Sequence, residues 1–202
     1  MPVGQNVAAI ILAAGFSSRM VEFKPLLPLG GSTVIETAVN VFIRAGISDT
    51  TVVIGHRADD LRLVLDRICI RRVINERYKK GMFSSVVAGL QSLGPEVGAA
   101  FLLPVDIPLV KSRTVEEIVK AYHRLGQRIF YPVFQSQRGH PPLIPANLFA
   151  EIMSWSGDRG MQSFLEQHEA QATEIEVGDE GILLDIDTPD DYSNILSRLE
   201  QP

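Results

Sequence analysis

The chain of 202 residues contains a single cysteine, Cys69, which excludes an intramolecular disulfide and a metal site built from cysteines. It also lacks a dense basic run, because 19 Lys and Arg stand against 24 Asp and Glu and the net charge is −5. Nucleic-acid-binding proteins usually present a basic face, and the aromatic residues are scattered along the sequence, so no nucleic-acid partner is expected. A small anionic ligand remains compatible with this composition, because a few cations and backbone N–H groups can bind one.

Long apolar runs are lacking too. The apolar stretch 1–14 carries no basic leader, and the segment 15–19 ends it before it reaches the length of a membrane span. We therefore expect a soluble, cytoplasmic protein with no membrane partner. In such a protein Cys69 is most simply a core residue.

Short apolar runs alternate with amphipathic segments along most of the chain. Strands are expected at 7–12, 51–54, 72–74, 99–105, 128–133, 174–177 and 182–184. Helices are expected at 34–45, 59–68, 81–93, 112–125 and 146–155, within 157–168, and from Pro189 onward. Runs such as Val7–Leu12, which are apolar at every position, indicate strands buried on both faces of a parallel sheet.

This alternation predicts an α/β fold with a doubly wound, mostly parallel sheet. Ligands of such folds bind at the carboxyl ends of the strands. We expect one domain over residues 1–202, with residues 138–181 as a less regular decoration of it.

The first candidate site follows the first strand, in the string LAAGFSSRM at Leu12–Met20. A turn of small residues can direct backbone N–H groups at phosphate oxygens, and Arg19 and Lys24 would add the charge that a triphosphate requires. A tight turn with two solvated cations explains the same residues. The spacing matches neither a Walker A loop nor G-x-G-x-x-G. The candidate nucleotide-binding residues here are Leu12, Ala13, Ala14, Gly15, Ser17, Arg19 and Lys24.

A second candidate lies at the start of the helix expected from Gly81. Ser84 and Ser85 place hydroxyl groups in its first turn, and Asn75 precedes it, which suits an anion or ribose site. Taken alone, these residues are explained more simply by a capped helix with small side chains for close packing.

Carboxylates follow two of the expected strands. Asp106 lies directly after the fourth, where it can hold a hard cation such as Mg²⁺ or cap the next turn. In the string DIDTPDDY, Thr188 is a good N-cap and explains the acidic residues after it. Asp187 precedes this cap, and Asp185 is its local rival for a role in metal binding.

Together these strings resemble those of the MobA-like nucleotidyltransferases. The matching strings are LAAGFSSRM, KPLLPLGG from Lys24, GMFSSVVAGL from Gly81, DIP from Asp106, and DIDTPDDY. The strings RGHP from Arg138 and GDRG from Gly157 are typical of the molybdenum cofactor cytidylyltransferase branch. The resemblance covers essentially the whole chain, and it implies a Rossmann-like fold related to the nucleotide-diphospho-sugar transferases. Val21 is a departure, since the family usually has glycine after the Arg-Met pair.

The resemblance implies a metal-dependent nucleotidyltransferase that joins CMP from CTP to the terminal phosphate of molybdopterin and releases pyrophosphate. It favours CTP over GTP because the guanylyl-transferring branch has other residues in the first two strings. Asp106 and Asp187 would hold Mg²⁺ or Mn²⁺, and Lys24, Arg19 and Asp106 would be the catalytic residues. The nucleotide site would also include Asn75, Gly81, Ser84 and Ser85.

The same resemblance places the acceptor beside Gly139, His140 and Asp158, within the less regular segment 138–181. On the residues alone, a lone histidine such as His140 is more often structural. Transient contact with a molybdenum hydroxylase would accompany delivery of the product. Two other functions remain open: transfer to a sugar phosphate or another phosphorylated small molecule, and non-catalytic carriage of the molybdenum cofactor.

Overall fold

The computed structural model describes residues 6–18, 20 and 22–199, and its centre is the strand β1 (Asn6–Ala13). Every side chain from Ala8 to Ala13 is buried. Ala9 and Ile11 join the apolar cluster on one face of the sheet, whereas Ala8 and Ile10 join the cluster on the other. Because side chains alternate across a strand, an uninterrupted apolar run is what a strand covered on both faces requires.

The main sheet has the order β10-β7-β9-β6-β1-β4-β5, with β8 paired to β7. The remaining strands are β4 (Thr50–Ile54), β5 (Arg71–Ile74), β6 (Val97–Pro104), β7 (Ile129–Phe134), β8 (Gln137–Arg138), β9 (Leu143–Pro145) and β10 (Ala172–Glu176). β1, β4, β5 and β6 pair in parallel, as do β7 and β10, whereas β9 is antiparallel to both of its neighbours. The sheet is therefore mixed but mostly parallel, as predicted. A separate hairpin pairs β2 (Pro28–Leu29) with β3 (Ser32–Thr33).

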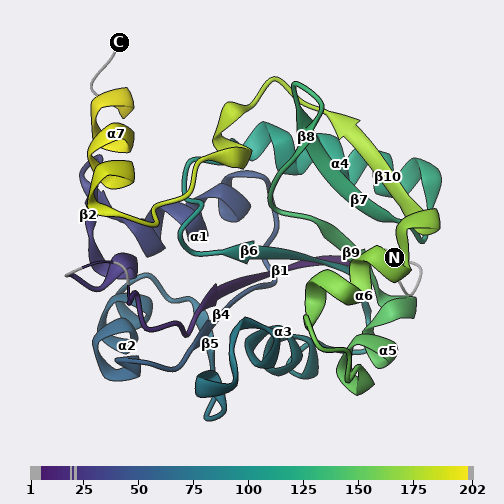
Figure 1. Cartoon of the computed structure of the whole chain (residues 1–202), viewed down its shortest axis with the longest axis horizontal. Coiled ribbons are helices and arrows are strands. Elements are labelled where there is room, and N and C mark those ends of the chain that lie inside the picture. Colours follow the sequence, from purple (N-terminus) through teal and green to yellow (C-terminus); the bar gives the residue numbers. More distant parts are fainter. Residues whose placement is uncertain (1–5, 19, 21, 200–202) are drawn as a thin grey trace.

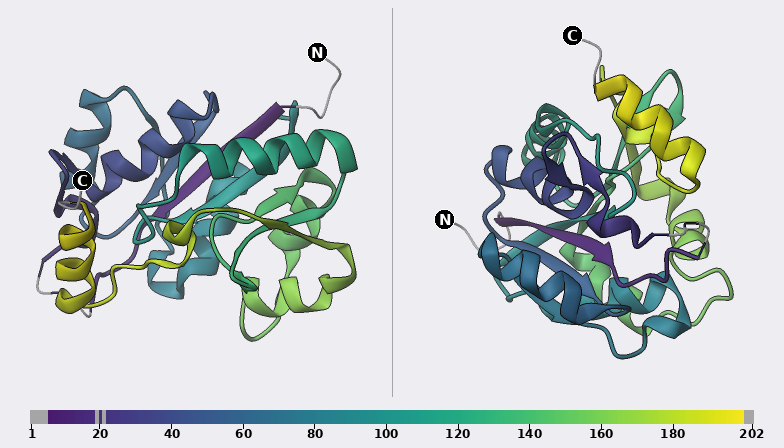
Figure 2. Two further views of the ribbon diagram at one scale, coloured as in Figure 1. Left: turned by 90° about the horizontal axis from the view of Figure 1, so that it is seen from above. Right: turned by 90° about the vertical axis from the view of Figure 1, so that its left-hand side faces the viewer.

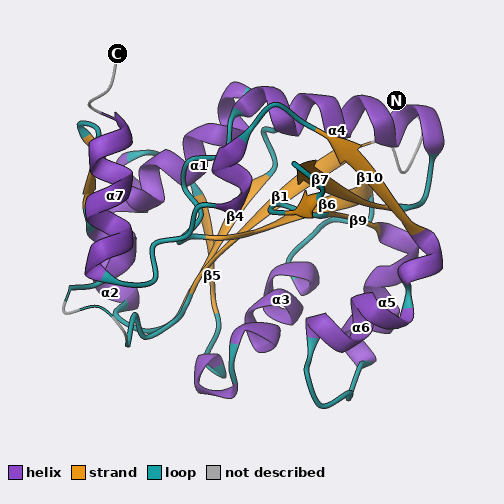
Figure 3. Ribbon diagram, turned by 45° about the horizontal axis from the view of Figure 1, so that its top comes forward, coloured by secondary structure: helices purple, strands orange, loops and turns teal. Residues whose placement is uncertain are grey.

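Helices cover both faces of this sheet (Figure 1). The apolar faces of α1 (Val34–Arg44), α2 (Ala58–Arg67) and α4 (Ser112–Leu125) belong to one core cluster. Those of α3 (Met82–Gln91), α5 (Phe149–Ser154) and α6 (Met161–Gln167) belong to the other. Figure 3 shows α1 and α4 above the sheet and α3, α5 and α6 below it. The doubly wound arrangement is thereby confirmed.

The last helix, α7 (Pro189–Leu199), and the pair α5 and α6 lie at opposite ends of the molecule (Figure 2). Short 3-10 helices complete the chain: η1 (Lys24–Leu26), η2 (Tyr78–Lys80), η3 (Ala146–Leu148), η4 (Glu169–Gln171) and η5 (Glu180–Leu183). Within the ranges that the structure describes, no helix combines the length and the apolar character needed to cross a membrane.

The helix starts expected from capping residues are confirmed at both ends of the chain. Thr33 and Glu36 form a capping box at α1, in which the Glu36 N–H donates to Thr33 Oγ1 and the Thr33 N–H to Glu36 Oε2. At α7, Thr188 Oγ1 accepts from the Asp191 N–H, and Asp191 Oδ2 accepts in return from the Thr188 N–H. Local hydrogen bonds thus decide where these helices begin.

Two expectations are wrong. Residues 182–184, expected as a strand, belong largely to the 3-10 helix η5, because Asp179 accepts a hydrogen bond from the Gly181 N–H and tightens the chain there. Cys69, expected in the core, is exposed. It follows α2 with a φ of 54°, in the left-handed conformation that commonly closes a helix at the surface.

The segment 138–181 supplies β9 and β10 to the main sheet. β9 enters between β6 and β7, antiparallel to both. Leu143 and Ile144 of β9 are fully buried, one in each core cluster. The part of the chain that sequence patterns described least therefore completes the core.

Candidate active site

A cavity of about 350 Å³ lies at the carboxyl ends of β1 and β6. It is lined by the turn after β1, by η1 and η2, by the start of α3 and by the end of β6. Its lining residues include Leu12, Ala13, Ala14, Gly15, Ser17, Lys24, Gly81, Ser85 and Asp106. Most of the predicted nucleotide-binding residues therefore surround one cavity, at the edge where a parallel sheet places its ligands.

The turn after β1 is shaped by Ser17, which has a φ of 54°. Its backbone oxygen accepts from the Met20 N–H at 2.9 Å, and its Oγ accepts from the Lys24 N–H at 3.2 Å. These bonds bring Lys24 back to the mouth of the turn. Arg19, predicted to bind phosphate, and Val21 lie outside the described residues.

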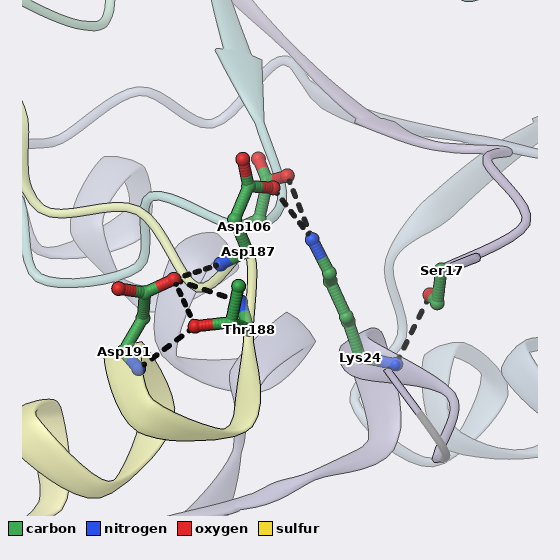
Figure 4. Close-up of polar contacts among 6 residues, drawn as sticks. All are labelled: Ser17, Lys24, Asp106, Asp187, Thr188 and Asp191. Atoms are coloured by element: carbon green, nitrogen blue, oxygen red, sulfur yellow. Dashed lines mark hydrogen bonds and ion pairs between the residues drawn. The ribbon is translucent and has the colours of Figure 1, made fainter. Parts of the chain in front are cut away.

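Lys24 connects the two carboxylates predicted to hold the metal (Figure 4). Its side chain is 8% exposed, and its Nζ lies 2.8 Å from Asp187 Oδ1 and 3.6 Å from Asp106 Oδ2. A buried ammonium group needs such partners, since an uncompensated buried charge is costly. The structure thus brings together three residues that the sequence separates widely.

Asp187 reaches this position through backbone contacts on both of its sides. The preceding residue, Ile186, donates its N–H to the backbone oxygen of Asp106 at 2.8 Å. The Asp187 N–H donates to Asp191 Oδ2 at 3.2 Å, within the cap of α7. The first bond joins the two acidic segments directly, and the second continues the capping pattern recognised in the sequence. Asp185, the rival considered for this role, has no contact with Lys24 among those observed in the described chain.

The electrostatic environment of Asp106 is mixed. Burial raises the pKa of its carboxyl group above the usual value, and the neighbouring charges of Asp187 and Asp185 act in the same direction. The Lys24 ammonium group opposes them by stabilising the charged form, but the pKa still stays raised. Any further cation that enters the cavity would therefore stabilise the charged form of the Asp106 carboxyl group.

The donor set fits a hard divalent cation. Asp106 and Asp187 both lie within 4 Å of one ammonium nitrogen, so their oxygens converge on a common region. Mg²⁺ is commonly bound by one or two carboxylates together with substrate phosphates and water. Among the described residues, no group of three or more His, Cys, Asp or Glu side chains converges, so protein ligands alone would not complete the coordination.

Asn75 and the two serines of α3 form a hydrogen-bonded group at the same cavity. The Asn75 amide nitrogen donates to Ser84 Oγ at 2.8 Å and to Ser85 Oγ at 2.9 Å, and its oxygen accepts from the Arg77 N–H. Ser84 Oγ itself donates to the backbone oxygens of Arg77 and Gly81. Ser85 lines the cavity, whereas Asn75 and Ser84 support it from behind.

The predicted acceptor-side residues fall in two places. Gly139 packs against the backbone of Ile182, and His140 donates its N–H to the Ile182 oxygen at 3.0 Å. Burial lowers the pKa of His140, although the Leu102 backbone and the charge of Asp185 act against this shift. The Nδ1 atom of His140 is buried, and it has no hydrogen-bond partner among the described residues. The loop that contains Asp158 lies elsewhere, with Gly160 packed closely against Phe83 of α3.

Sequence reasoning missed an aromatic group at the edge of the cavity. Phe16 lies 5.1 Å from His56 and 5.2 Å from Tyr78 between ring centroids, although the three residues are far apart in sequence. Phe16 and Tyr78 line the cavity, and Phe16 is 49% exposed. Gly55 was the available signal, because a Cβ there would lie 2.7 Å from that of Tyr78.

Comparison with known proteins places this geometry in a family. The family model described as MobA-like NTP transferase domain matches residues 9–172. Among curated proteins, the chain is 28% identical to the molybdenum cofactor cytidylyltransferase of Escherichia coli, over 95% of this chain and 96% of that protein. It is 30% identical to the nicotine blue oxidoreductase of Paenarthrobacter nicotinovorans, over 94% of this chain and 96% of that protein.

Solved structures agree with the fold. The crystal structure of Rv0371c from Mycobacterium tuberculosis has a TM-score of 0.84 and 26% identity, covering 95% of this chain and 97% of that one. A complex of Rv0371c with manganese has a TM-score of 0.80 and 24% identity, covering 95% of this chain and 98% of that one. The neighbours include nucleotidyltransferases, which confirms the predicted nucleotide-diphospho-sugar transferase-like fold.

Proposed function

Because the chain belongs to the MobA-like NTP transferase family, we propose that it joins CMP from CTP to the terminal phosphate of molybdopterin and releases pyrophosphate. The observation that carries this proposal is the contact of Lys24 with both Asp106 and Asp187 beside the cavity. A cation between two carboxylates, next to a turn of small residues, suits a triphosphate whose charge must be neutralised.

The proposed chemistry is an in-line displacement at the α-phosphorus, with the acceptor phosphate as nucleophile and pyrophosphate as leaving group. Backbone N–H groups of Ala14–Ser17 would hold the triphosphate, and Arg19 would bind the β- and γ-phosphates. Lys24 would contact the α-phosphate and stabilise the charge that develops there. Positioning and electrostatic stabilisation supply the catalysis, and no covalent enzyme intermediate is needed.

Asp106 and Asp187 are the proposed ligands of Mg²⁺ or Mn²⁺. The manganese complex of Rv0371c supports the use of a divalent cation in this fold. When bound, such an ion polarises phosphate oxygens and neutralises part of their charge. Ser85 would meet the ribose or base, with Asn75 and Ser84 fixing its orientation.

The acceptor is the least constrained part of the proposal. The curated cytidylyltransferase supports molybdopterin, and His140 would lie toward the pterin. Other acceptors, such as a sugar phosphate, would use the same nucleotide site, because fold and nucleotide loop do not identify the acceptor. A pure cofactor carrier is disfavoured, since binding without transfer does not require Lys24 together with two carboxylates.

Pyrophosphate release is the measurement that tests the proposal. CTP, GTP, ATP and UTP would each be incubated with Mg²⁺ and the protein, with and without molybdopterin. We expect release from CTP only when molybdopterin is present. No release from any nucleotide, with folded protein and a competent acceptor, would refute this proposal.

The oxidoreductase among the relatives calls for a separate control. Reduced nicotinamide dinucleotide would be incubated with the protein and with nicotine blue as the electron acceptor, and the absorbance of both compounds would be followed. We expect no oxidation, because the cation and carboxylates beside the cavity suit phosphoryl transfer.

A further inference from the structure

Asp179 is a buried carboxylate that the proposed mechanism does not use. The residue is only 1% exposed, and it lies in the connection between β10 and η5, eight positions before Asp187 in the numbering. A buried carboxylate is costly unless hydrogen bonds compensate it. We therefore expect hydrogen bonds that compensate the burial of Asp179 and give it a structural role.

The hydrogen bonds of Asp179 join two elements. Its Oδ2 accepts from the Lys111 N–H at 2.8 Å and from Thr114 Oγ1 at 2.7 Å, both at the start of α4. Its Oδ1 accepts from the Gly181 N–H at 3.0 Å, at the start of η5. One carboxylate thus accepts hydrogen bonds at the starts of two helices, and within the described structure Lys111, the N-cap residue of α4, makes no capping hydrogen bond with its own side chain.

These bonds attach the segment 179–187 to the segment 106–111, which carries the other metal-site carboxylate. Gly181 passes so close to the backbone oxygen of Leu109 that a Cβ would collide with it. Further along, the Ile186 N–H donates to the Asp106 oxygen at 2.8 Å. The two segments are therefore held together from Asp179 to the residue before Asp187.

We propose that Asp179 is a positioning residue for the metal site: it holds segment 179–187 on the start of α4 and so places Asp187 opposite Asp106. This inference rests on the proposed nucleotidyl transfer. Loss of a partner that orients metal ligands typically weakens metal affinity or activity about 10- to 100-fold. Asp179 contacts no nucleotide-cavity residue among its observed hydrogen bonds, so nucleotide affinity in the absence of metal should not depend on it.

The principal test is Asp179→Asn in the full-length protein. The amide keeps the shape but turns one acceptor into a donor, which would face the Lys111 N–H or the Gly181 N–H. Mn²⁺ affinity would be measured by titration in the presence of a non-hydrolysable CTP analogue, after subtraction of binding by the analogue alone. We expect Mn²⁺ affinity to fall about 10- to 100-fold. Affinity for the analogue without metal should stay unchanged, and kcat should recover in part at high Mn²⁺.

Matched variants separate positioning from general destabilisation. Thr114→Val removes one of the hydrogen bonds to Asp179 and should weaken Mn²⁺ binding in the same direction, whereas Thr114→Ser keeps the hydroxyl and should behave as the unmodified protein. Thr33→Ala weakens the cap of α1, whose hydrogen bonds involve neither Asp179 nor Thr114, and should lower the melting temperature without changing Mn²⁺ affinity. If Asp179→Asn does not fold, the two Thr114 variants still decide the question.

Mn²⁺ affinity within twofold of the unmodified protein in Asp179→Asn, or equal affinities in Thr114→Val and Thr114→Ser, would overturn the inference. A loss in Asp179→Asn no larger than that in Thr33→Ala would overturn it as well. Failure of the proposed function has another signature. The unmodified protein would then neither bind Mn²⁺ with the analogue nor release pyrophosphate.

Discussion

Two regions meet at the proposed active site, and different interactions position their residues. In the proposed nucleotide-binding region, residues 6–111, the site residues follow strands or open helices: Lys24 opens η1 after the turn of β1, Ser85 lies in the first turn of α3, and Asp106 follows β6. In the second region, residues 138–187, which contains the proposed acceptor side, the corresponding residues lie in loops. Hydrogen bonds and close packing place Gly139, His140 and Asp187 there, and for Asp187 they include a bond within the cap of α7.

The two regions differ in whether a site residue is positioned by residues near it in the sequence or by residues far from it. The apolar run of β1 forms a strand that ends at the ligand edge of the sheet, and this depends on residues close together in the sequence. The neighbouring strands fix only how far the turn after β1 lies from the other site residues. Asp187, in contrast, depends on the backbone of Asp106, and His140 depends on that of Ile182. Mutations should therefore act locally in the first region and at a distance in the second.

The largest effect is expected where the two regions touch. Lys24→Met and Asp106→Asn each remove a charge that would face the transferring phosphate. Loss of one such electrostatic group typically lowers kcat about 10²- to 10³-fold. Pyrophosphate release from CTP with the acceptor measures the loss, and circular dichroism establishes that each variant is folded.

A charge control makes this first comparison sharper. Lys120→Met removes an exposed cation from α4 and should change kcat by less than about twofold. Lys24→Met should also raise the affinity of the nucleotide-free protein for Mn²⁺, because the ammonium group no longer neutralises Asp106 and Asp187. Normal turnover in Lys24→Met, or unchanged Mn²⁺ affinity, would contradict the role assigned to Lys24.

The next effect compares one glycine from each region. In Gly89→Ala, the added Cβ would lie 2.5 Å from Cγ2 of Ile10, a fully buried side chain, and we expect a loss of about 1–3 kcal/mol in unfolding free energy. In Gly181→Ala, the Cβ would meet the backbone oxygen of Leu109, and we expect a loss of about 3 kcal/mol or more. Urea unfolding measures both.

Mn²⁺ affinity distinguishes the two glycine variants further. Gly181→Ala should weaken Mn²⁺ binding, since the collision shifts the segment that leads to Asp187. Gly89→Ala should retain Mn²⁺ affinity because Gly89 contacts only the core between α3 and the sheet. Equal effects on Mn²⁺ affinity would mean that the two regions do not differ as described.

Sequence patterns predicted the first region well for a physical reason. Uninterrupted apolar runs and capping residues act within a few positions, so β1 and α1 could be located before any contact was known. The convergence of Asp187 on Lys24 was predictable only by resemblance, since no spacing rule joins residues so far apart. The strand expected at 182–184 is wrong because Asp179 and Gly181 create a tight turn that apolar content does not reveal.

The aromatic group of Phe16, His56 and Tyr78 was missed for a similar reason. Two loops and the 3-10 helix η2 supply these rings, and each ring alone is unremarkable in the sequence. The glycine that allows the close approach of Tyr78, Gly55, follows β4 directly and has no side chain that would signal a site. A group of side chains that come from separate segments can therefore be recognised only in the three-dimensional structure, even where each segment is predicted correctly.

A smaller effect is expected inside the nucleotide cavity. Ser85 is 4% exposed, and its Oγ accepts from the Asn75 amide, so its proton can be donated to a bound nucleotide. Ser85→Ala removes about 1 kcal/mol of hydrogen bonding and should raise the KM for CTP about fivefold. Ser92→Ala, at the far end of α3, serves as the control, with an unchanged KM expected. A KM unaffected by Ser85→Ala would place the base or ribose elsewhere.

The smallest effect is expected at the cap of α1, which tests whether local structure in the first region is independent of the site. Burial raises the pKa of Glu36, but hydrogen bonds from Thr33 and the nearby Arg67 outweigh it, so the pKa lies below the usual 4.5. A lowered carboxyl pKa stabilises the folded protein above about pH 4.5, and this contribution is lost as the pH falls through the folded-state value. Glu36→Gln should therefore lower the melting temperature at pH 7, and its difference from the unmodified protein should shrink below pH 4.5. Thr33→Ala should cost about 1 kcal/mol at pH 7 with kcat unchanged. If the melting temperatures of Glu36→Gln and the unmodified protein differed by the same amount across this pH range, the Glu36 charge would not stabilise α1.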